Sequence, residues 1–312
     1  MTGATGFVGR YMRAALAERW PTAIVSSLGA KDEAGDGVTA IDLLDRDGVH
    51  AAVAAAQPDL VIHLAAQASV AKSISADGQT WDVNVTGSVN LATATAAHAP
   101  EATVLFVSSS EVYGASYMAG MASEATPLAP LSAYGKSKAA AERLLAEILP
   151  PRARLIVARP CNHTGVGQRT AFVLPLFAEQ IALMEAGRKP PRLEVGNIDV
   201  AREFLDVRDV VDAYIALIDT APRLPGRFTC NIASGDARPL RERVEFMREQ
   251  AKVRFEIVVD PGRLRPFDLP VVACDASLLR AVTGWAPRRD MRTTLVELLE
   301  AARMQQREPG RL

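Results

Sequence analysis

A tyrosine and a lysine stand four residues apart in the segment Tyr134–Lys138. The segment opens a predicted helix over 133–148, and this spacing places both side chains on one helix face. A lysine ammonium beside a phenol favours the phenolate, so Lys138 is expected to lower the pKa of Tyr134. The phenol could then exchange a proton with a carbonyl or carbinol oxygen near neutral pH. The same spacing also occurs on solvated helix faces, so its position in the fold decides its meaning.

Hydroxyl and carboxyl groups follow the preceding predicted strand, in the segment Val107–Gly114. A side chain at the carboxyl end of a parallel strand points into the crevice where ligands bind. Ser109 could therefore hydrogen-bond a substrate oxygen, whereas Ser108 and Ser110 are expected only to end the strand. Glu111 could protonate a leaving hydroxyl in a sheltered cleft. The predicted catalytic residues are Ser109, Glu111, Tyr134 and Lys138.

Three other polar residues have simpler explanations. Asn84 is expected to be only a helix cap. His63 lies within an apolar strand and is expected to be a buried strand histidine, and His98 is expected at the surface. No catalytic role is predicted for either histidine.

The glycines Gly3, Gly6 and Gly9 precede a helical stretch. Glycine permits a tight turn and a close approach of the backbone to a pyrophosphate, and the following helix N-terminus offers free N–H groups. On its own such a loop is more often an ordinary turn, but the alternating strands and helices that follow favour dinucleotide binding. Asp42 suits a contact to the adenine edge, although an exposed loop aspartate is nearly as good an explanation.

A glycine loop of this kind should follow a central hydrophobic strand, but the sequence begins at Met1. The absence of that strand would leave two buried sheet edges with unpaired backbone groups. Our hypothesis is that the natural protein begins several residues earlier and that Met1 stands where a strand-ending apolar residue belongs. The alternative is that the start is correct and the sheet is rearranged. Mass spectrometry of the native protein distinguishes the two.

The residues after the second predicted strand bear on the choice of cofactor. A ribose 2′-hydroxyl usually pairs with a carboxylate, and a 2′-phosphate pairs with a cation. No acidic residue ends this strand, and Ser26, Ser27 and Lys31 slightly favour NADP(H) over NAD(H). Asp32 and Glu33 lie close by and weaken the preference.

Apolar strands alternate with Ala- and Leu-rich helices through the first half of the chain. This alternation predicts an α/β fold with a doubly wound parallel sheet of the Rossmann type. We assign 1–160 plus 198–221 to a dinucleotide-binding domain, and 161–197 plus 222–312 to a smaller substrate-binding lobe. The predicted strands are Ala23–Ser27, Gly37–Ile41, Leu60–Leu64, Thr103–Ser108 and Arg154–Arg159, and the predicted helices include Tyr11–Arg19, Gly48–Ala56, Val85–His98 and Ala133–Ile148.

The composition narrows the possible functions. The 35 Lys and Arg nearly cancel the 36 Asp and Glu, so neither nucleic acid nor a membrane surface is expected as a partner. No apolar run is long enough to span a bilayer, and no cleavable leader opens the chain. The three cysteines are scattered, which argues against a disulfide framework or a metal site. A cytoplasmic enzyme is therefore expected.

Taken in order along the chain, these motifs resemble those of the extended short-chain dehydrogenases/reductases. The matching segments are Thr2–Gly9, His63–Gln67, Ser108–Gly114 and Tyr134–Lys138. The resemblance covers essentially the whole chain. It implies NAD(P) as cofactor and a homodimer formed through the helices at 85–98 and 133–148. The implied cofactor-binding residues are Gly3, Thr5, Gly6, Phe7, Val8, Asp42, Leu43, Leu64, Ala65, Ala66, Tyr134 and Lys138.

The second half of the chain is similar to GDP-mannose 4,6-dehydratases and GDP-6-deoxy-D-mannose reductases. The similarity lies in the segments Asn162–Gln168, Val195–Ile198, Arg202–Asp209, Leu264–Pro270 and Thr283–Pro287. It implies that Arg202 and Arg265 face the GDP pyrophosphate, that Asp268 binds the guanosine ribose, and that Asn162 contacts the sugar or its phosphates. Arginine forks suit phosphate oxygens, although a surface salt bridge is the simpler alternative for either arginine.

The resemblance implies reduction of the C4 keto group of GDP-4-dehydro-6-deoxy-D-mannose to GDP-D-rhamnose. Tyr134 would donate the proton, Lys138 would tune Tyr134 and hold the nicotinamide ribose, and Ser109 would polarise the carbonyl. The alternatives are a GDP-mannose 4,6-dehydratase, a 4-epimerase, and a sensor or scaffold that binds dinucleotide without turnover. The segments Leu28–Ala30 and Thr164–Gly167 lack the basic residues of the dehydratases at these places, which favours the reductase.

Overall fold

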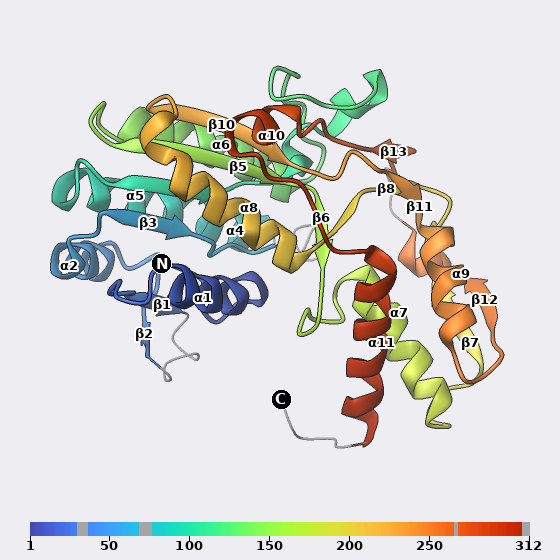
Figure 1. Ribbon diagram of the computed structural model, residues 1–312. Coiled ribbons are helices and arrows are strands. Elements are labelled where there is room, and N and C mark those ends of the chain that lie inside the picture. The colour runs from blue at the N-terminus through green and yellow to red at the C-terminus, as the bar shows by residue number, and fades with distance from the viewer. Residues whose placement is uncertain (30–36, 69–76, 265–267, 308–312) are drawn as a thin grey trace.

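The computed structural model describes residues 1–29, 37–68, 77–264 and 268–307. Four predicted residues, Lys31, Asp32, Glu33 and Arg265, lie outside these ranges. Figure 1 shows a parallel sheet covered by helices, with a second group of helices and short strands beside it. No described helix is both long and apolar enough to cross a membrane.

The large sheet is parallel, and its neighbouring strands are β10 (Arg227–Ile232), β5 (Arg154–Pro160), β4 (Thr103–Val107) and β3 (Leu60–His63). Beyond β3, Thr2 forms bridges to both His63 and Leu28. Strand β1 (Ser27–Gly29) follows and pairs with β2 (Val38–Ala40). The sheet therefore has the Rossmann order that the sequence predicts.

The start of the chain occupies the centre of this sheet. The Thr2 amide donates to the Ile62 carbonyl at 2.9 Å, and the Met1 carbonyl accepts from the Leu28 amide at 2.8 Å. The rearranged sheet is thus not found, because Met1 and Thr2 pair on both sides. The hypothesis that strand residues precede Met1 stays a prediction.

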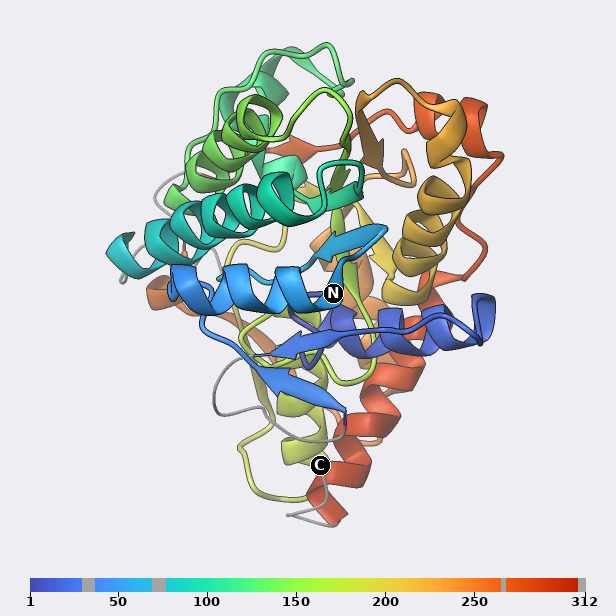
Figure 2. The ribbon, with the colours of Figure 1, turned by 90° about the vertical axis from the view of Figure 1, so that its left-hand side faces the viewer.

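Helices cover both faces of the large sheet (Figure 2). Successive strand residues point to opposite faces, so Leu105 joins the core under one set of helices and Phe106 joins the core under the other. The first set is α1 (Phe7–Arg19) and α8 (Val207–Thr220), and the second is α2 (Arg46–Ala56), α5 (Gly87–His98) and α6 (Ala133–Ile148).

Several predicted elements differ from the structure, and α1 begins at Phe7, one turn before the predicted Tyr11. The predicted strand over 23–27 is wrong except at Ser27, because β1 pairs only where Met1–Thr2 and β2 lie beside it, and Ile24 is 98% exposed. The predicted helix over 85–98 is divided. A π-helical turn over Asp82–Thr86 precedes α5, which begins at Gly87.

A second core forms beside the large sheet. It lies between the parallel pair β7 (Arg192–Val195) and β12 (Glu256–Val259) and the helices α7 (Val173–Glu185), α9 (Leu240–Gln250) and α11 (Met291–Arg307). Short strands connect it to the large sheet. They are β6 (Asn162–Thr164) with β9 (Phe204–Asp206), and β8 (Ala201–Arg202) with β11 (Arg238–Pro239) and β13 (Val271–Val272).

One part of the predicted domain boundary is wrong. Residues 222–312 are predicted to lie in the smaller lobe, but β10 pairs with β5 along its full length in the large sheet. Leu279 of α10 (Ser277–Thr283) and Trp285 also join the large-sheet core. The strand β10 completes this edge of the sheet because it pairs with the outer edge of β5.

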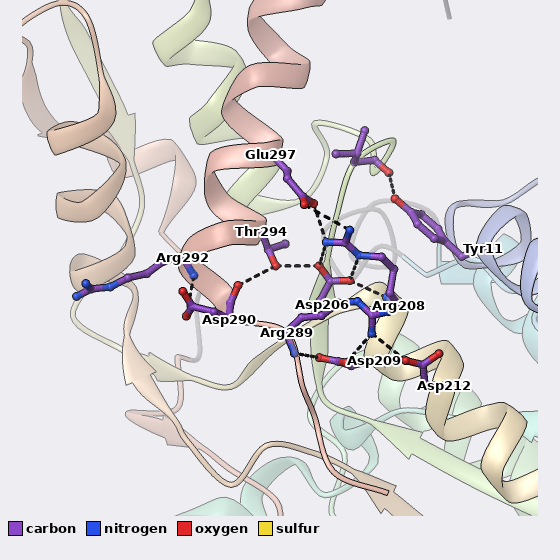
Figure 3. A network of polar contacts seen from close by, with 11 residues as sticks. Tyr11, Asp206, Arg208, Asp209, Asp212, Arg289, Asp290, Arg292, Thr294 and Glu297 are labelled. Carbon is purple, nitrogen blue, oxygen red and sulfur yellow. Dashed lines mark hydrogen bonds and ion pairs between the residues drawn. The ribbon is translucent and has the colours of Figure 1, made fainter.

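A polar network joins α8 to α11 (Figure 3). The Asp206 carboxylate caps α8 by accepting from the Arg208 amide at 2.7 Å, and it accepts from the Thr294 hydroxyl of α11 at 2.8 Å. Arg208 also donates to Glu297 of α11 at 2.6 Å. Burial alone would raise the pKa of Asp206, but the bonds from Arg208 and Thr294 lower it. The two cores are thus fixed together by charged hydrogen bonds.

Candidate active site

The glycine loop packs so closely against neighbouring backbone that Gly3 and Gly9 leave no room for a side chain. Gly3 has a φ of +69°, and a Cβ there would lie 2.7 Å from the Ala65 amide nitrogen. A Cβ on Gly9 would lie 2.0 Å from the Gly3 carbonyl oxygen. Gly6 is the N-cap of α1 and no side chain caps this end, so the first amides of the helix have no helical partner. This cradle suits the pyrophosphate of a dinucleotide.

The other predicted cofactor residues lie around this loop. Leu64 and Ala65 contact Gly3 closely, and Phe7 and Val8 open α1. The Phe7 ring stacks on His163 with the ring centroids 6.3 Å apart.

The loop after β2 is held against α5. The Asp42 carboxylate accepts from the Leu44 amide at 3.0 Å, and the Leu43 carbonyl accepts from the Asn90 side chain at 2.8 Å. Ser27 begins β1 and is buried, so neither it nor Ser26 ends that strand. The predicted use of these serines at the ribose is therefore wrong, because the strand lies further along the chain.

Tyr134 stands in the first turn of α6, which Ser132 caps by accepting from the Gly135 amide at 3.0 Å. Burial raises the pKa of Tyr134 to about 12, a hydrogen bond with Ser109 opposes this effect, and the nearby Glu111 adds to it. Three of the four predicted catalytic residues therefore lie together. The expected lowering of the Tyr134 pKa by Lys138 is not found: burial has the largest effect on this pKa, and the group that opposes it is Ser109.

Lys138 is buried at the carboxyl end of β4. Its Nζ donates to the Val107 carbonyl at 2.7 Å and lies 4.9 Å from the centre of the Phe106 ring. Burial lowers the pKa of Lys138 to about 7, and the Glu142 carboxylate opposes this effect. The ammonium is therefore directed to the strand end from which Ser109 also extends.

Asn84 has a larger role than the expected helix cap. It lies in the π-helical turn, and π-helical turns are frequent at functional sites. Its side-chain oxygen accepts from the Gln67 amide at 2.8 Å, and its side-chain nitrogen donates to the Ser137 hydroxyl at 3.0 Å. Asn84 thus ties the loop after β3 to α6 beside Lys138. No sequence spacing predicts this contact, because it joins separate elements.

The predicted substrate residues converge at the junction of the two cores. Arg202 donates to the Asp268 carboxylate at 2.6 Å and to the Leu269 carbonyl at 2.7 Å. The Asn162 side chain donates to the Glu203 carbonyl at 3.1 Å. Three predicted residues from distant segments are therefore close together, and the fourth, Arg265, lies outside the described residues.

The loop after β6 is attached to α1. The Tyr11 hydroxyl of α1 donates to the Val166 carbonyl at 2.8 Å, and Figure 3 draws this bond as the dashed line from Tyr11. Arg10 of the same helix donates to the Gly167 carbonyl at 2.9 Å. The predicted sugar-binding segment is thus attached to the helix that follows the predicted phosphate loop.

His63 is a buried strand histidine, as the sequence predicts. Its Nδ1 lies 2.7 Å from the Thr2 hydroxyl and its Nε2 lies 2.9 Å from the Ser88 hydroxyl. Burial lowers the pKa of His63 to about 3, and nearby Lys138 and the N-terminal amine lower it further. The imidazole is therefore neutral in the folded protein.

This burial predicts a pH dependence of stability. Below about pH 6.5 the unfolded chain protonates His63 and the folded chain does not, so the free energy of unfolding should fall as the pH decreases from 6.5 towards 3. Urea unfolding measured between pH 4 and 7 checks this. In a His63→Asn variant the slope should be shallower by up to about 1.4 kcal/mol per pH unit. Equal slopes for both proteins would contradict the prediction.

The fold and the glycine cradle define a dinucleotide-binding enzyme with a buried tyrosine and lysine near the carboxyl end of β4. Residues 1–233 match the family described as the NAD dependent epimerase/dehydratase family. The chain belongs to this NAD-dependent enzyme family.

Individual relatives agree with this assignment. The chain is 35% identical to the GDP-6-deoxy-D-mannose reductase of Pseudomonas aeruginosa, over 96% of this chain and 95% of that protein. It is 28% identical to the dTDP-6-deoxy-L-talose 4-dehydrogenase (NAD(P)(+)) of Kitasatospora kifunensis, over 96% and 93% of the two chains. The solved structure of RMD from Pseudomonas aeruginosa complexed with NADPH superimposes with a TM-score of 0.82 at 34% identity and covers 97% of each chain.

Proposed function

We propose that this chain reduces the C4 keto group of GDP-4-dehydro-6-deoxy-D-mannose with NADPH and forms GDP-D-rhamnose. The observation that carries the proposal is the buried Tyr134 phenol, which is hydrogen-bonded with Ser109 and lies near Glu111 just beyond the end of β4. Reduction of a ketone requires a proton donor, and a tyrosine phenol carries its proton at neutral pH and can act as a general acid. The reductase of Pseudomonas aeruginosa, 35% identical, supports the choice of sugar.

The residues of the chain have separate roles in this reaction. Tyr134 donates its phenolic proton to the C4 oxygen, and the Ser109 hydroxyl hydrogen-bonds that oxygen as negative charge develops on it. Lys138 holds the nicotinamide ribose and stabilises the phenolate left on Tyr134. Reduced nicotinamide, when bound, supplies the hydride.

The glycine cradle fits a dinucleotide, because the uncapped first amides of α1 can bind phosphate oxygens. Gly3, Thr5, Gly6, Phe7 and Val8 would hold the pyrophosphate, and Asp42 with Leu43 would contact the adenine. NADPH is proposed over NADH because the solved relative is complexed with NADPH.

The GDP portion would lie against the junction of the two cores. Arg202 and Arg265 would contact the pyrophosphate, Asp268 the guanosine ribose, and Asn162 the sugar or its phosphates. The ion pair of Arg202 with Asp268 brings two of these residues together at the edge of the second core, and a guanidinium group suits phosphate oxygens. We also propose a cytoplasmic homodimer formed through α5 and α6, which pack together in one layer.

A screen of activated keto-sugars tests the nucleotide choice. We expect the protein to oxidise NADPH with GDP-4-dehydro-6-deoxy-D-mannose at least about tenfold faster than with the matching UDP or dTDP sugars, because unpaired base contacts cost binding energy. Loss of absorbance of the reduced cofactor reports the rate. Faster turnover of a UDP or dTDP sugar would contradict the GDP assignment, and binding without any turnover would favour a sensor.

A further inference from the structure

A buried ion pair lies directly behind the predicted catalytic residues. Nε of Arg159 donates to Oε1 of Glu142 at 2.9 Å, and Nη2 of Arg159 donates to Oε2 of Glu142 at 2.5 Å. Both side chains are only 8% exposed. Glu142 belongs to α6 and Arg159 to β5, so the pair attaches the helix that carries Tyr134 and Lys138 to the sheet.

The Glu142 carboxylate has a third partner on another strand. The Ser108 hydroxyl at the end of β4 donates to Oε1 of Glu142. Ser108 immediately precedes Ser109, so its hydrogen bond fixes the strand end from which Ser109 extends. One carboxylate therefore connects α6, β4 and β5 at the places where the predicted catalytic residues arise.

The arginine continues the network away from the crevice. Nη1 of Arg159 donates to the Tyr113 hydroxyl at 3.0 Å, and that hydroxyl donates to the Asn231 side-chain oxygen of β10 at 2.7 Å. A buried ion pair is often no more stabilising than well-packed apolar side chains. Stability alone is therefore a weak explanation for a network placed here.

Glu142 also acts on Lys138 by its charge. It stands four residues after Lys138 and so lies on the same face of α6. Burial lowers the pKa of Lys138, and the Glu142 carboxylate opposes this by favouring the ammonium. His63 of β3 also interacts with Lys138, but its pKa of about 3 leaves it neutral. A negative charge at Glu142 therefore helps Lys138 to stay charged.

We propose that Glu142 is a positioning residue of the active site. Its bonds to Arg159 and Ser108 fix the position of α6 relative to β5 and the end of β4. Its charge lies one helical turn from Lys138. The proposal rests on the proposed reductase function, because it concerns the same site.

The test is Glu142→Gln, which keeps the shape and removes the charge. We expect turnover to fall on the order of tenfold, because small misplacements of reacting groups are costly. The alkaline limb of kcat/KM should also move to lower pH by about one unit, since Lys138 loses a neighbouring opposite charge. A purely structural role would lower the melting temperature and leave the pH limb in place, and that result would overturn the proposal.

Glu147→Gln is the matched control on the same helix. Glu147 is 61% exposed and pairs only at the surface with Arg143, at 3.1 Å. The control should keep both the turnover and the pH limb of the wild type. A limb shifted equally in the control would overturn the specific role of Glu142.

Two further measurements keep the test decisive. NADPH affinity can be measured by fluorescence across pH without any turnover. The affinity should decline at high pH, and this decline should begin at a lower pH in Glu142→Gln than in the wild type or in Glu147→Gln. If the wild type lacks turnover, the proposed function fails while this titration still tests Glu142, and identical profiles would overturn its role.

If Glu142→Gln does not fold, Ser108→Ala removes one bond and leaves the ion pair. The proposal is supported if Ser108→Ala reduces turnover several-fold and leaves the alkaline limb of kcat/KM at the wild-type pH. Turnover equal to that of the wild type would overturn it.

Discussion

Replacing Tyr134 with phenylalanine should reduce turnover by at least about 10²-fold, the usual loss when a general acid is removed. The ring stays in its buried place in the first turn of α6, and only a hydroxyl at the crevice is lost. The folded structure should therefore remain, which thermal unfolding and circular dichroism can check. Steady-state oxidation of NADPH measures the effect.

The binding of NADPH serves as the internal control for this variant. The pyrophosphate cradle belongs to Gly3–Val8, so the affinity for the cofactor should change little. Turnover near that of the wild type would remove Tyr134 from the mechanism. A loss of turnover accompanied by a collapsed fold would leave Ser109→Ala as the cleaner test, since Ser109 is the partner of Tyr134 in the crevice.

Gly9→Ala should abolish useful cofactor binding. The new Cβ would lie 2.0 Å from the Gly3 carbonyl oxygen and 2.8 Å from the Ala4 carbonyl carbon, and both are backbone atoms that cannot rotate away. The loop must shift, and a shift of this kind can weaken binding on the order of 10²-fold. Overpacking should also cost about 1–3 kcal/mol of stability. Titration of NADPH and urea unfolding measure the two effects.

Gly226→Ala is the control for this prediction. Gly226 is exposed in the turn before β10, and a Cβ there meets nothing within 4 Å. This variant should bind NADPH as the wild type does. If Gly9→Ala also bound NADPH normally, the cradle would not be the cofactor site.

Much of the fold follows from local patterns in the sequence. The helix α6 has the predicted bounds, because Ser132 is a good cap and the apolar residues repeat at helical spacing. The strands β3, β4 and β5 begin at the predicted residues, since each is a continuous apolar run buried on both faces. The glycine loop was predictable for the same reason, because its spacing is local.

What the sequence could not predict depends on distant partners. The strand β10 joins the large sheet through pairing with β5, about 70 residues earlier in the chain. The position of β1 is set by Met1 and Thr2 beside it, and β-propensity alone favours the exposed residues before it. The raised pKa of Tyr134 arises from burial, which residue spacing does not reveal. The contacts of Asn84 and Glu142 likewise join elements that only the fold brings together.

The choice between reductase and dehydratase tests the account most directly. The purified protein should oxidise one equivalent of NADPH for each GDP-4-dehydro-6-deoxy-D-mannose and release GDP-D-rhamnose. With GDP-mannose and NADP⁺ but no reduced cofactor it should form no 4-keto sugar, because Tyr134 acts here as the proton donor of a reduction. Formation of the 4-keto product from GDP-mannose by this protein alone would contradict the account and would give Glu111 the central role.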